Sequence, residues 1–417
     1  MSTLHYVSTD LAAAIRHFEL CQLASRSLSA EDQITLIRKK PGGLLLEALH
    51  PDLTFKIYWE NSELSELTLN PQYEYQVETA LVVQLLKGFS KEIPLELGVS
   101  REGLHLRNGE NLSIVPWLAY TKTTESELVP SGEEDLEKPS GEIVLSFASK
   151  QLTRLKALLK SIPKEAVSTA LLALQIRYRG DEPLVCTVGN GVYFAEWQGP
   201  VQSGRGQGLL HLEEGHAELL VACLERANPL TLQIYPQFLS LKTETLEAQI
   251  PLRDKAFPNL RRFQTIQGSQ SFQGEAKQFD QALKGLLPLS DDVLPELEIV
   301  RQQDDVLTFR LYQGDASQGT VEVTGPLQDF RLLVRSDFLK EIKRLLKGKI
   351  WTWTLLETDP EILRVEDDQV RFWFRPMLDP RSEKQIVKME RDQRKMEALE
   401  EAELVEPDYT EPLVELL

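Results

Sequence analysis

Apolar and cationic positions follow a regular pattern between residues 335 and 377. In the first part of this stretch the apolar residues recur at helical spacing and the cations fall on the opposite side, which predicts an amphipathic helix. The apolar positions are Phe338, Leu339, Ile342, Leu345 and Leu346, and the cations are Lys340, Lys343, Arg344 and Lys347. Gly348 is a natural helix stop. Three runs of β-forming residues follow, at 350–356, 362–365 and 370–374, so the stretch predicts one helix and three strands.

The same pattern restarts along the whole chain. Further helices are predicted at 9–26, 77–89, 150–162, 216–227 and 275–287. Their apolar clusters lie about 60–70 residues apart, which is the period of a helix plus hairpin strands rather than of a short solenoid repeat. Six units of this kind predict three domains of two units each. The predicted domains are residues 1–125, 141–256 and 257–379, with an acidic linker at 126–140 and a charged tail at 380–417.

The segments between the helices are predicted to be short antiparallel strands. In the first domain they include 34–38, 43–48, 53–59 and 64–69. The connections are too short for parallel crossovers. The expected fold class is therefore α+β, with two helices per domain packed on one side of antiparallel sheets. Further along the chain, Gly189-Asn190-Gly191 is typical of a hairpin turn, and residues 198–208 predict a flexible loop.

Composition limits the class of protein. A chain of 417 residues with 42% hydrophobic residues is large enough for ordinary cores. Its apolar runs fall short of the roughly 20 residues that span a bilayer. The first residues lack the features of a secretory signal. Cys21, Cys186 and Cys223 are too few and too scattered for a disulfide framework, so we expect a cytoplasmic protein.

Charge separates the helices from the rest of the chain. A formal charge of −18 argues against a protein coated in nucleic acid. The cations concentrate on the predicted helices, however, and one electropositive surface built from helices suits sequence-independent contact with phosphates. The candidate contacts are Lys150, Arg154, Lys160, Lys277, Lys284, Lys340, Lys343, Arg344 and Lys347. The alternative for any single helix is an ordinary solvated face. The helix at 77–89 fits poorly, since it offers only Lys87.

The sequence predicts no catalytic apparatus, metal or cofactor. Pairs of aspartates occur at 291–292, 304–305 and 367–368, where turns are expected, and are interpreted as exposed turns. The six histidines show no metal-ligand spacing. The chain contains neither a Gly-x-Ser-x-Gly elbow nor a P-loop. The glycines of 204–208 do not open directly into a helix after a clear strand, so a phosphate loop is not predicted there.

Two short motifs carry a resemblance to a known family. Residues 257–263 read Phe-Pro-Asn-Leu-Arg-Arg-Phe, and residues 374–377 read Phe-Arg-Pro-Met. With the sixfold helix–sheet repeat, they resemble the bacterial replicative sliding clamp, the beta subunit of DNA polymerase III. In that family the first motif typically reads Phe-Pro-Asp-Tyr-Arg-Arg, and the chain typically ends in Met-Pro-Met-Arg-Leu. The resemblance covers about residues 1–379 in architecture and is most specific from about 140 onward.

The resemblance implies a function without catalysis. Clamps of this family form a head-to-tail ring of two subunits, whose helices line a channel around duplex DNA. The ring acts as a processivity factor that tethers DNA polymerase, and the clamp loader binds it through short hydrophobic motifs. One alternative is a clamp-derived regulatory or interaction protein that does not encircle DNA. Another is an enzyme acting on DNA, such as a nuclease, which would require clustered carboxylates or histidines.

The resemblance also assigns two contact surfaces. The partner-peptide groove would include Thr187, Gly189, Val192, Pro258, Phe263, Trp373, Phe374, Pro376 and Met377. The sequence departs from the family at 190–191, where Asn-Gly replaces the usual His-Arg, and at Arg375, which replaces Met. Plain core packing is the alternative for the aromatic residues, and in a regular strand Trp373 and Phe374 cannot both face inward. The subunit interface would pair Leu112 and Ile114 with Leu286 and Leu287.

The tail is the largest departure from the family. Clamps usually end near the position of Met377, whereas this chain continues to residue 417. The last five residues, Leu-Val-Glu-Leu-Leu, are short and apolar like a clamp-binding peptide. We hypothesise that the tail occupies a groove or competes for it, and the alternative is a disordered, solubilising tail.

Overall fold

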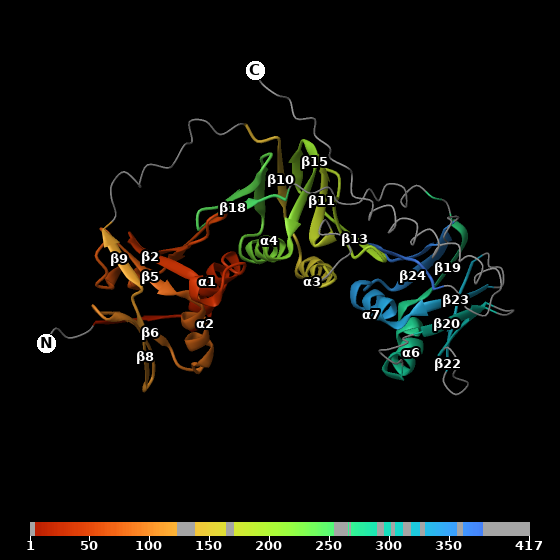
Figure 1. Cartoon of the computed structure of the whole chain (residues 1–417), viewed down its shortest axis with the longest axis horizontal. Helices are drawn as coiled ribbons and strands as arrows, with labels where there is room; N and C mark the ends of the chain where they lie inside the picture. Colours follow the sequence, from red (N-terminus) through yellow and green to blue (C-terminus); the bar gives the residue numbers. More distant parts are fainter. Residues whose placement is uncertain are drawn as a thin grey trace, which may run out of the picture. The chain divides into compact units, whose positions relative to one another are not determined.

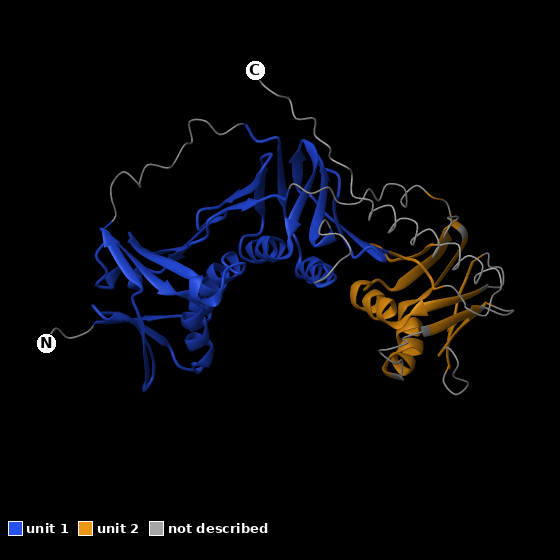
Figure 2. Cartoon of the chain, in the orientation of Figure 1, with its two compact units in different colours: residues 1–264, 369–372 blue, residues 265–368, 373–417 orange. Residues whose placement is uncertain are grey.

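The structure is a computed structural model, in which the placed residues form two compact units (Figures 1 and 2). The residues described are 5–122, 138–163, 171–253, 266, 268–289, 296–301, 305–311, 318–325, 330–356 and 362–377. Unit 1 comprises residues 1–264 and 369–372, and unit 2 comprises residues 265–368 and 373–417. Unit 1 thus holds the first two predicted domains, while the division into three domains stays a prediction. Most of the predicted linker, the 257–263 motif and the tail lie outside the described residues.

All six predicted helices are present. They are α1 (Leu11–Ala24), α2 (Thr79–Gly88), α3 (Ser149–Leu159), α4 (Glu214–Arg226), α6 (Ala276–Leu286) and α7 (Ser336–Leu345). Asp10 caps α1, because its carboxylate accepts a hydrogen bond from the N–H of Ala12 at 3.0 Å. In α7 the apolar stripe is buried, from Phe338 through Ile342 to Leu345, while Lys340 on the opposite side is exposed. The helical spacing of apolar residues therefore correctly predicts which side of α7 is buried.

Unit 1 begins with a four-stranded antiparallel sheet in the order β1-β6-β7-β8. The strands are β1 (Tyr6–Thr9), β6 (Leu95–Val99), β7 (Gly103–Asn108) and β8 (Asn111–Pro116). The first strand of the chain thus pairs with a strand that follows the second helix, in a register that places Tyr6 opposite Gly98. The strand β8 forms an edge of this sheet.

A ten-stranded sheet runs through both predicted domains of unit 1, in the order β14-β10-β16-β17-β18-β4-β3-β2-β5-β9. Its strands are β14 (Ser203–Arg205), β10 (Gly141–Leu145), β16 (Leu230–Ile234), β17 (Phe238–Lys242), β18 (Leu246–Pro251), β4 (Thr54–Glu60), β3 (Gly43–Ala48), β2 (Ile34–Lys40), β5 (Tyr73–Glu78) and β9 (Ala119–Lys122). Strands β18 and β4 join the two halves, with Leu246 opposite Ile57 and Ala248 opposite Phe55. All four side chains are buried, so the joint is part of the core and explains why two predicted domains form one unit.

The second half of unit 1 also contains four strands that pair in the order β15-β11-β12-β13. These are β15 (Gln207–Glu213), β11 (Ala173–Arg179), β12 (Leu184–Gly189) and β13 (Tyr193–Gly199). The predicted hairpin turn between β12 and β13 is confirmed. The side chain of Asn190 accepts hydrogen bonds from the N–H groups of Val192 and Tyr193, both at 2.9 Å, and Gly191 has a φ of 92°, which favours glycine.

Unit 2 repeats this plan. One sheet has the order β22-β21-β20-β23, and the strands β25, β24 and β19 form another antiparallel set. The strands are β22 (Gln318–Glu322), β21 (Val306–Leu311), β20 (Glu296–Arg301), β23 (Phe330–Arg335), β25 (Ile362–Glu366), β24 (Ile350–Leu356) and β19 (Gly268–Glu275). Phe279 of α6 lies at the centre of the core, with its ring 5.4 Å from Trp351, 5.5 Å from Trp353 and 6.0 Å from Phe309. The tryptophans of 350–356 are therefore core residues.

Two sequence predictions of local structure are wrong. Residues 64–69 do not form a strand, because a 3₁₀ helix spans Ser62–Glu66 and buries Leu64. The side chain of Asn61 caps this helix by accepting a hydrogen bond from the N–H of Glu63 at 2.9 Å. Residues 198–208 are not simply a loop, since they contain β14 and the start of β15. A local side-chain cap decides the first case, and pairing of β14 with the distant strand β10 decides the second, and the apolar pattern encodes neither.

Candidate functional site

The helices of unit 1 form a continuous row on one side of the sheets. Helix α1 contacts α2 and α4, and α4 contacts α3, so the order along the row is α2-α1-α4-α3 (Figure 1). Each helix turns its apolar stripe toward the sheets. The polar sides of four helices thus share one face of unit 1, which is the arrangement that the charge pattern predicts.

Helix α3 carries the basic part of this row. It contains no acidic residue, and Lys150 and Lys160 at its two ends are exposed and form no ion pair among the described residues. Arg154 is half-buried and donates a hydrogen bond to the side-chain oxygen of Gln369 at 2.6 Å, so part of its donor capacity is used within the fold. Lys150 and Lys160 are accordingly the freer of the predicted phosphate contacts on α3.

The rest of the row is not uniformly basic. Helix α4 contains Glu214, Glu218 and Glu225, and Glu225 pairs with Lys156 of α3 at 2.6 Å. On α2, Lys87 pairs with Glu19 of α1 at 2.7 Å. Within this row α3 thus carries exposed lysines while α4 carries three glutamates, and the expected electropositive helical surface stays a prediction.

Unit 2 presents a second group of cations on α6 and α7. Lys277, Lys284 and Lys340 are exposed and form no ion pair among the described residues of the unit. Lys343 pairs with Asp280 of α6 at 2.7 Å and so links the two helices, and Arg344 pairs with Glu341. The ammonium group of Lys347 donates to the carbonyl of Lys343 at 2.9 Å. These contacts hold the paired cations in place and leave the first three lysines for a ligand.

Asp367 fixes the end of α7. Its carboxylate accepts hydrogen bonds from the N–H groups of Lys347 at 2.8 Å and Gly348 at 2.7 Å. The sequence interpretation of residues 367–368 as an exposed turn missed this contact, because the two partners are separated by a strand pair. A carboxylate bound in this way positions the chain that follows the cationic helix.

The predicted groove residues are divided between the two units. In unit 1, Thr187 is buried with 3% exposure, Gly189 is buried, and Val192 at the hairpin is 46% exposed. In unit 2, Trp373 and Phe374 at the end of β26 (Val370–Phe374) are 3% and 1% exposed. Pro258 and Phe263 lie outside the described residues.

Trp373 and Phe374, the two aromatic residues of β26 in the predicted groove, are both buried, although they point to opposite faces of the strand. Phe374 lies against Phe338 of α7, with ring centroids 5.4 Å apart, so core packing accounts for it. Pro376 is buried, and the N–H of Met377 donates to the carbonyl of Leu333 at 2.8 Å. Met377 is half-buried, which leaves Val192 and Met377 as the accessible apolar members of the predicted set.

The predicted interface residues differ in exposure. Leu112 and Ile114 lie on the edge strand β8 and are 52% and 43% exposed. Leu286 and Leu287 are 2% and 7% exposed, and thus belong to the core of unit 2. The first pair is available for a partner. The second pair contributes almost no surface, because the end of α6 turns it inward.

Known structures were compared with this fold. A DNA polymerase III beta subunit from Thermotoga maritima matches with a TM-score of 0.72 and 12% identity, covering 89% of this chain and 99% of that one. A sliding clamp from Pseudomonas aeruginosa bound to griselimycin gives 0.70 and 13%, with coverage of 89% and 99%. A beta clamp from Helicobacter pylori bound to a DNA ligase peptide gives 0.67 and 11%, with coverage of 89% and 100%.

The chain has the DNA sliding-clamp fold. A search against models of protein families finds no match to the sequence, and a search of curated proteins finds none either. The fold is thus shared at identities of 11–13% with the three structures named above. The α+β class expected from the sequence is thereby confirmed.

Within the clamp fold, a buried histidine lies at the junction of α1 and α4. His17 is 4% exposed and stacks on Trp59, with ring centroids 5.0 Å apart. Its Nδ1–H group donates to the carbonyl of Ala13 at 2.5 Å, and Nε2 accepts from the guanidinium of Arg226 at 2.7 Å. Burial and, to a smaller degree, the Arg226 cation lower the pKa of His17 to about 4.

We expect this histidine to make stability depend on pH. The pKa is about 4 in the folded state and 6.5 ordinarily, so between these values the unfolded state binds the extra proton. The free energy of unfolding is highest above pH 6.5 and falls as the pH drops toward 4, by about 3 kcal/mol from this residue. Urea unfolding at pH 7 and pH 4 should show that His17→Gln, whose amide oxygen still accepts from Arg226, loses about 3 kcal/mol less than the parent. Equal losses would contradict the assignment.

The described part of the chain holds neither a metal-ligand cluster nor a membrane-spanning helix, and its three cysteines are unpaired. In the segments that the structure describes, no cluster of His, Cys, Asp and Glu side chains could hold a metal ion. Within the same segments, each helix is too short or too polar to span a membrane. Cys21, Cys186 and Cys223 are buried and unpaired, and burial raises the pKa of Cys21 and Cys223 to about 12, so these thiols stay protonated.

Proposed function

We propose that the protein is a DNA sliding clamp, a non-catalytic processivity factor that encircles duplex DNA as a homodimeric ring in the cytoplasm. The observation that carries the proposal is the placement of exposed lysines on the helices of a clamp fold. Lys150 on α3 and Lys160 at its C-terminal end are exposed, as are Lys277, Lys284 and Lys340 on α6 and α7, and the described residues provide no carboxylate partner for any of them. Such cations can exchange one phosphate for the next without reading bases.

Partner binding through a groove is part of the same proposal. The relatives from Helicobacter pylori and Pseudomonas aeruginosa were solved with a DNA ligase peptide and with griselimycin, respectively. In this chain Val192 and Met377 provide accessible apolar surface at two of the matching positions. A short hydrophobic motif of a polymerase or clamp loader is the expected ligand, with Asn190 and Gly191 changing its preference relative to the family.

A clamp-derived protein that does not encircle DNA is the second candidate. It is favoured by the acidic α4 and by the pairing of Lys87 with Glu19, which reduce the cationic surface of the first two domains. Only the first candidate encloses the DNA, so an experiment that detects a topological link between protein and DNA decides between them.

We expect retention on DNA to depend on closed ends. The protein is allowed to thread onto linear duplex DNA that carries biotin at both ends, streptavidin is then added, and the complex is washed with high salt, which weakens phosphate contacts. A ring stays on the blocked duplex and leaves when a restriction enzyme cuts it. If high salt removes the protein from the duplex although both ends are blocked, the protein does not encircle DNA. If the protein leaves uncut and cut blocked duplexes equally, the second candidate is supported.

A further inference from the structure

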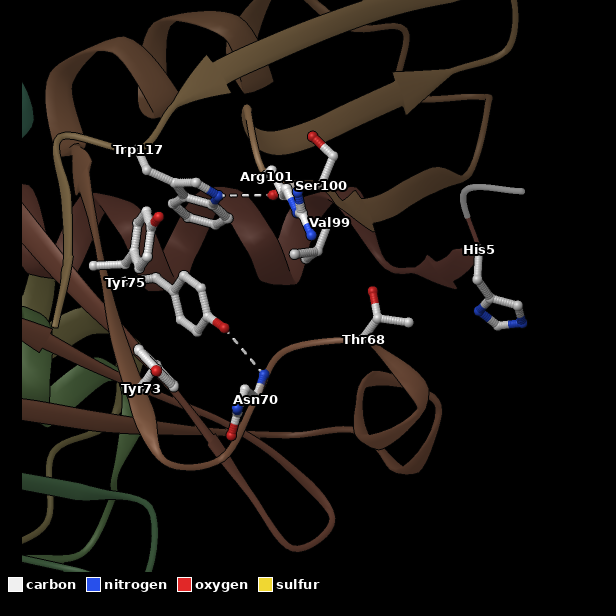
Figure 3. A pocket seen from close by; sticks show the side chains of 10 residues that line it. His5, Thr68, Asn70, Tyr73, Tyr75, Val99, Ser100, Arg101 and Trp117 are labelled. Atoms are coloured by element: carbon white, nitrogen blue, oxygen red, sulfur yellow. Dashed lines mark hydrogen bonds between the residues drawn. The ribbon is translucent and has the colours of Figure 1, made fainter. Parts of the chain in front are cut away.

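A cleft lined by aromatic side chains lies in the first half of unit 1, away from the helices. It has a volume of about 1030 Å³, and Tyr73, Tyr75, Trp117 and Tyr120 contribute its rings. Figure 3 shows the rings of Tyr73, Tyr75 and Trp117 together on one side of the cleft and His5 on the other, with Arg101 near Trp117. The cleft is formed where β5 and β9 of the ten-stranded sheet approach the turn between β6 and β7. We refer to these ring-bearing residues and Arg101 as the aromatic cleft.

The aromatic cleft is rigid at its base. The indole N–H of Trp117 donates to the carbonyl of Ser100 at 2.9 Å, and the hydroxyl of Tyr75 accepts from the N–H of Asn70 at 3.0 Å (Figure 3). The rings of Tyr75 and Trp117 lie 5.0 Å apart, tilted by 49°. Neither ring has to be ordered when a ligand binds, which lowers the entropic cost of binding.

The side chain of Tyr120 is the solvent-exposed ring of the cleft. Tyr120 is 62% exposed, the largest exposed fraction among the exposed large hydrophobic side chains of the described residues. It lies opposite Tyr75 in the strand register, and its ring is 6.3 Å from that of Tyr73. An exposed tyrosine beside two further rings gives adjacent faces on which proline and apolar side chains of an extended peptide pack.

The charge of the aromatic cleft is opposite to that of the protein. The chain has 64 acidic and 46 basic residues, yet none of the described residues that line the cleft is acidic. Arg101 is exposed and forms no ion pair within the described part of the chain. An arginine without a partner at an aromatic surface favours a carboxylate-bearing ligand.

A sheet edge completes the site. Strand β9 is the last strand of the ten-stranded sheet, and β5 is its one neighbour among the described strands. Its outer edge therefore has backbone N–H and C=O groups for which the described strands provide no partner. Such an edge recognises a polypeptide backbone and gives no contact specific to nucleic acid.

We infer that the aromatic cleft and the edge of β9 bind an extended, acidic, proline-containing peptide of a partner protein. The peptide backbone pairs with β9, a proline packs on Tyr120, and a glutamate or aspartate meets Arg101. The site lies within unit 1, distant in sequence from the predicted groove residues, and is independent of the function proposed above.

The test uses the full-length protein and a defined set of peptides. Each fluorescent peptide has twelve residues, with one proline at the centre and otherwise serine and valine. One glutamate replaces a different residue in each member, so that the set samples every position on both sides of the proline. At least one member should bind with a Kd below about 100 μM, a range usual for short motifs of this size. Its counterpart with lysine in place of glutamate should bind at least about tenfold more weakly, because it faces Arg101. If no member of the set binds, the inference is wrong.

Variants locate the binding. Tyr120→Ala and Arg101→Glu should each weaken the best peptide about tenfold or more, while Leu209→Ala, which removes an equally exposed apolar side chain elsewhere in unit 1, should leave the Kd unchanged. A short hydrophobic motif of the clamp-binding type should bind all three variants equally. If the best peptide binds Tyr120→Ala and Arg101→Glu as it binds the parent, the aromatic cleft is not its site.

Backbone pairing has its own signature. N-methyl groups are placed on alternate residues of the best peptide, in the two possible phases. Pairing with β9 predicts that one phase abolishes binding and the other preserves it, because alternate N–H groups point toward the edge. Equal effects of both phases would exclude strand addition.

A nucleic acid is the rival ligand of the cleft, and single-stranded oligothymidine is used as its probe. If the parent binds oligothymidine and Tyr120→Ala does not, the cleft binds nucleic acid and the inference is wrong.

Discussion

Aspartate at both Leu112 and Ile114 should convert the proposed dimer into monomers. The two side chains are 52% and 43% exposed on the edge strand β8, and alternate positions place them on the same face. A strand added to this edge would cover both of them, and two carboxylates would then be buried without partners. We expect the dissociation constant of the dimer to rise about 1,000-fold or more, measured by analytical ultracentrifugation.

The control for this experiment is another edge strand. Leu209 on β15 is 54% exposed, and β15 is the end strand of its sheet. Leu209→Asp makes one substitution of the same kind at such an edge and should leave the dimer intact. A parent protein that sediments as a monomer at micromolar concentration would refute the proposed ring. Dissociation by Leu209→Asp would instead move the interface to β15.

Reversing three lysine charges in unit 2 should have the largest effect on DNA binding. Lys277, Lys284 and Lys340 are exposed and pair with no carboxylate of the described residues, so glutamate at all three should leave the fold unchanged. If each contacts one phosphate, the slope of log K against log salt concentration becomes smaller by about 2.7. Binding to a short duplex at low salt should weaken at least about tenfold. Fluorescence anisotropy across a salt series measures both quantities.

A matched triple variant separates local contact from net charge. Lys122, Lys138 and Lys242 are also exposed, and they lie on β9, in a connection and on β17 rather than on helices. Glutamate at these three positions gives the same net charge, so general repulsion of DNA is the same for both triples. We expect the slope of log K against log salt concentration to stay unchanged in the control triple and to become smaller in the Lys277, Lys284 and Lys340 triple. Equal changes would mean that the lysines of α6 and α7 do not contact phosphates.

The helices could be predicted because their periodicity has one dominant cause. Each helix buries a stripe against a sheet, so residues such as Phe338 and Ile342 recur at helical spacing and the cations fall elsewhere. The strands that run directly into helices could not be predicted. Strand β5 ends at Glu78 and α2 begins at Thr79, and β23 ends at Arg335 where α7 begins at Ser336. No glycine or proline marks these transitions, so the turn signals that delimit strands are missing.

The candidate site could be predicted in kind but not in detail. The positions of Lys277, Lys284 and Lys340 follow from the charge pattern of their helices. Asp280 pairs with Lys343 because α7 packs beside α6. The sequence pattern of either helix alone does not predict this contact. Leu286 and Leu287 show the same limit, because a terminal pair of leucines looks alike in sequence whether it faces a partner or the core.

The aromatic cleft shows what sequence inspection missed. Tyr73 and Tyr75 alternate on β5, while Trp117 and Tyr120 come much later in the chain, directly after β8 and on β9. The Tyr-x-Tyr alternation is a usable signal for one face of a strand. Only the antiparallel pairing of β5 with β9 brings the second pair of rings onto that face.

The interlaced strands have a consequence for synthesis on the ribosome. Tyr6 pairs with Gly98, and in the next repeat Gly141 pairs with Ile234, so each of these strands is made long before its partner. While the intervening residues are translated, the apolar stripe of α1 has no completed sheet to cover it. Loop closure over such distances is slow, and exposed apolar surface in a nascent chain promotes aggregation. We therefore expect the emerging polypeptide to depend on ribosome-associated chaperones until each pair of strands has closed.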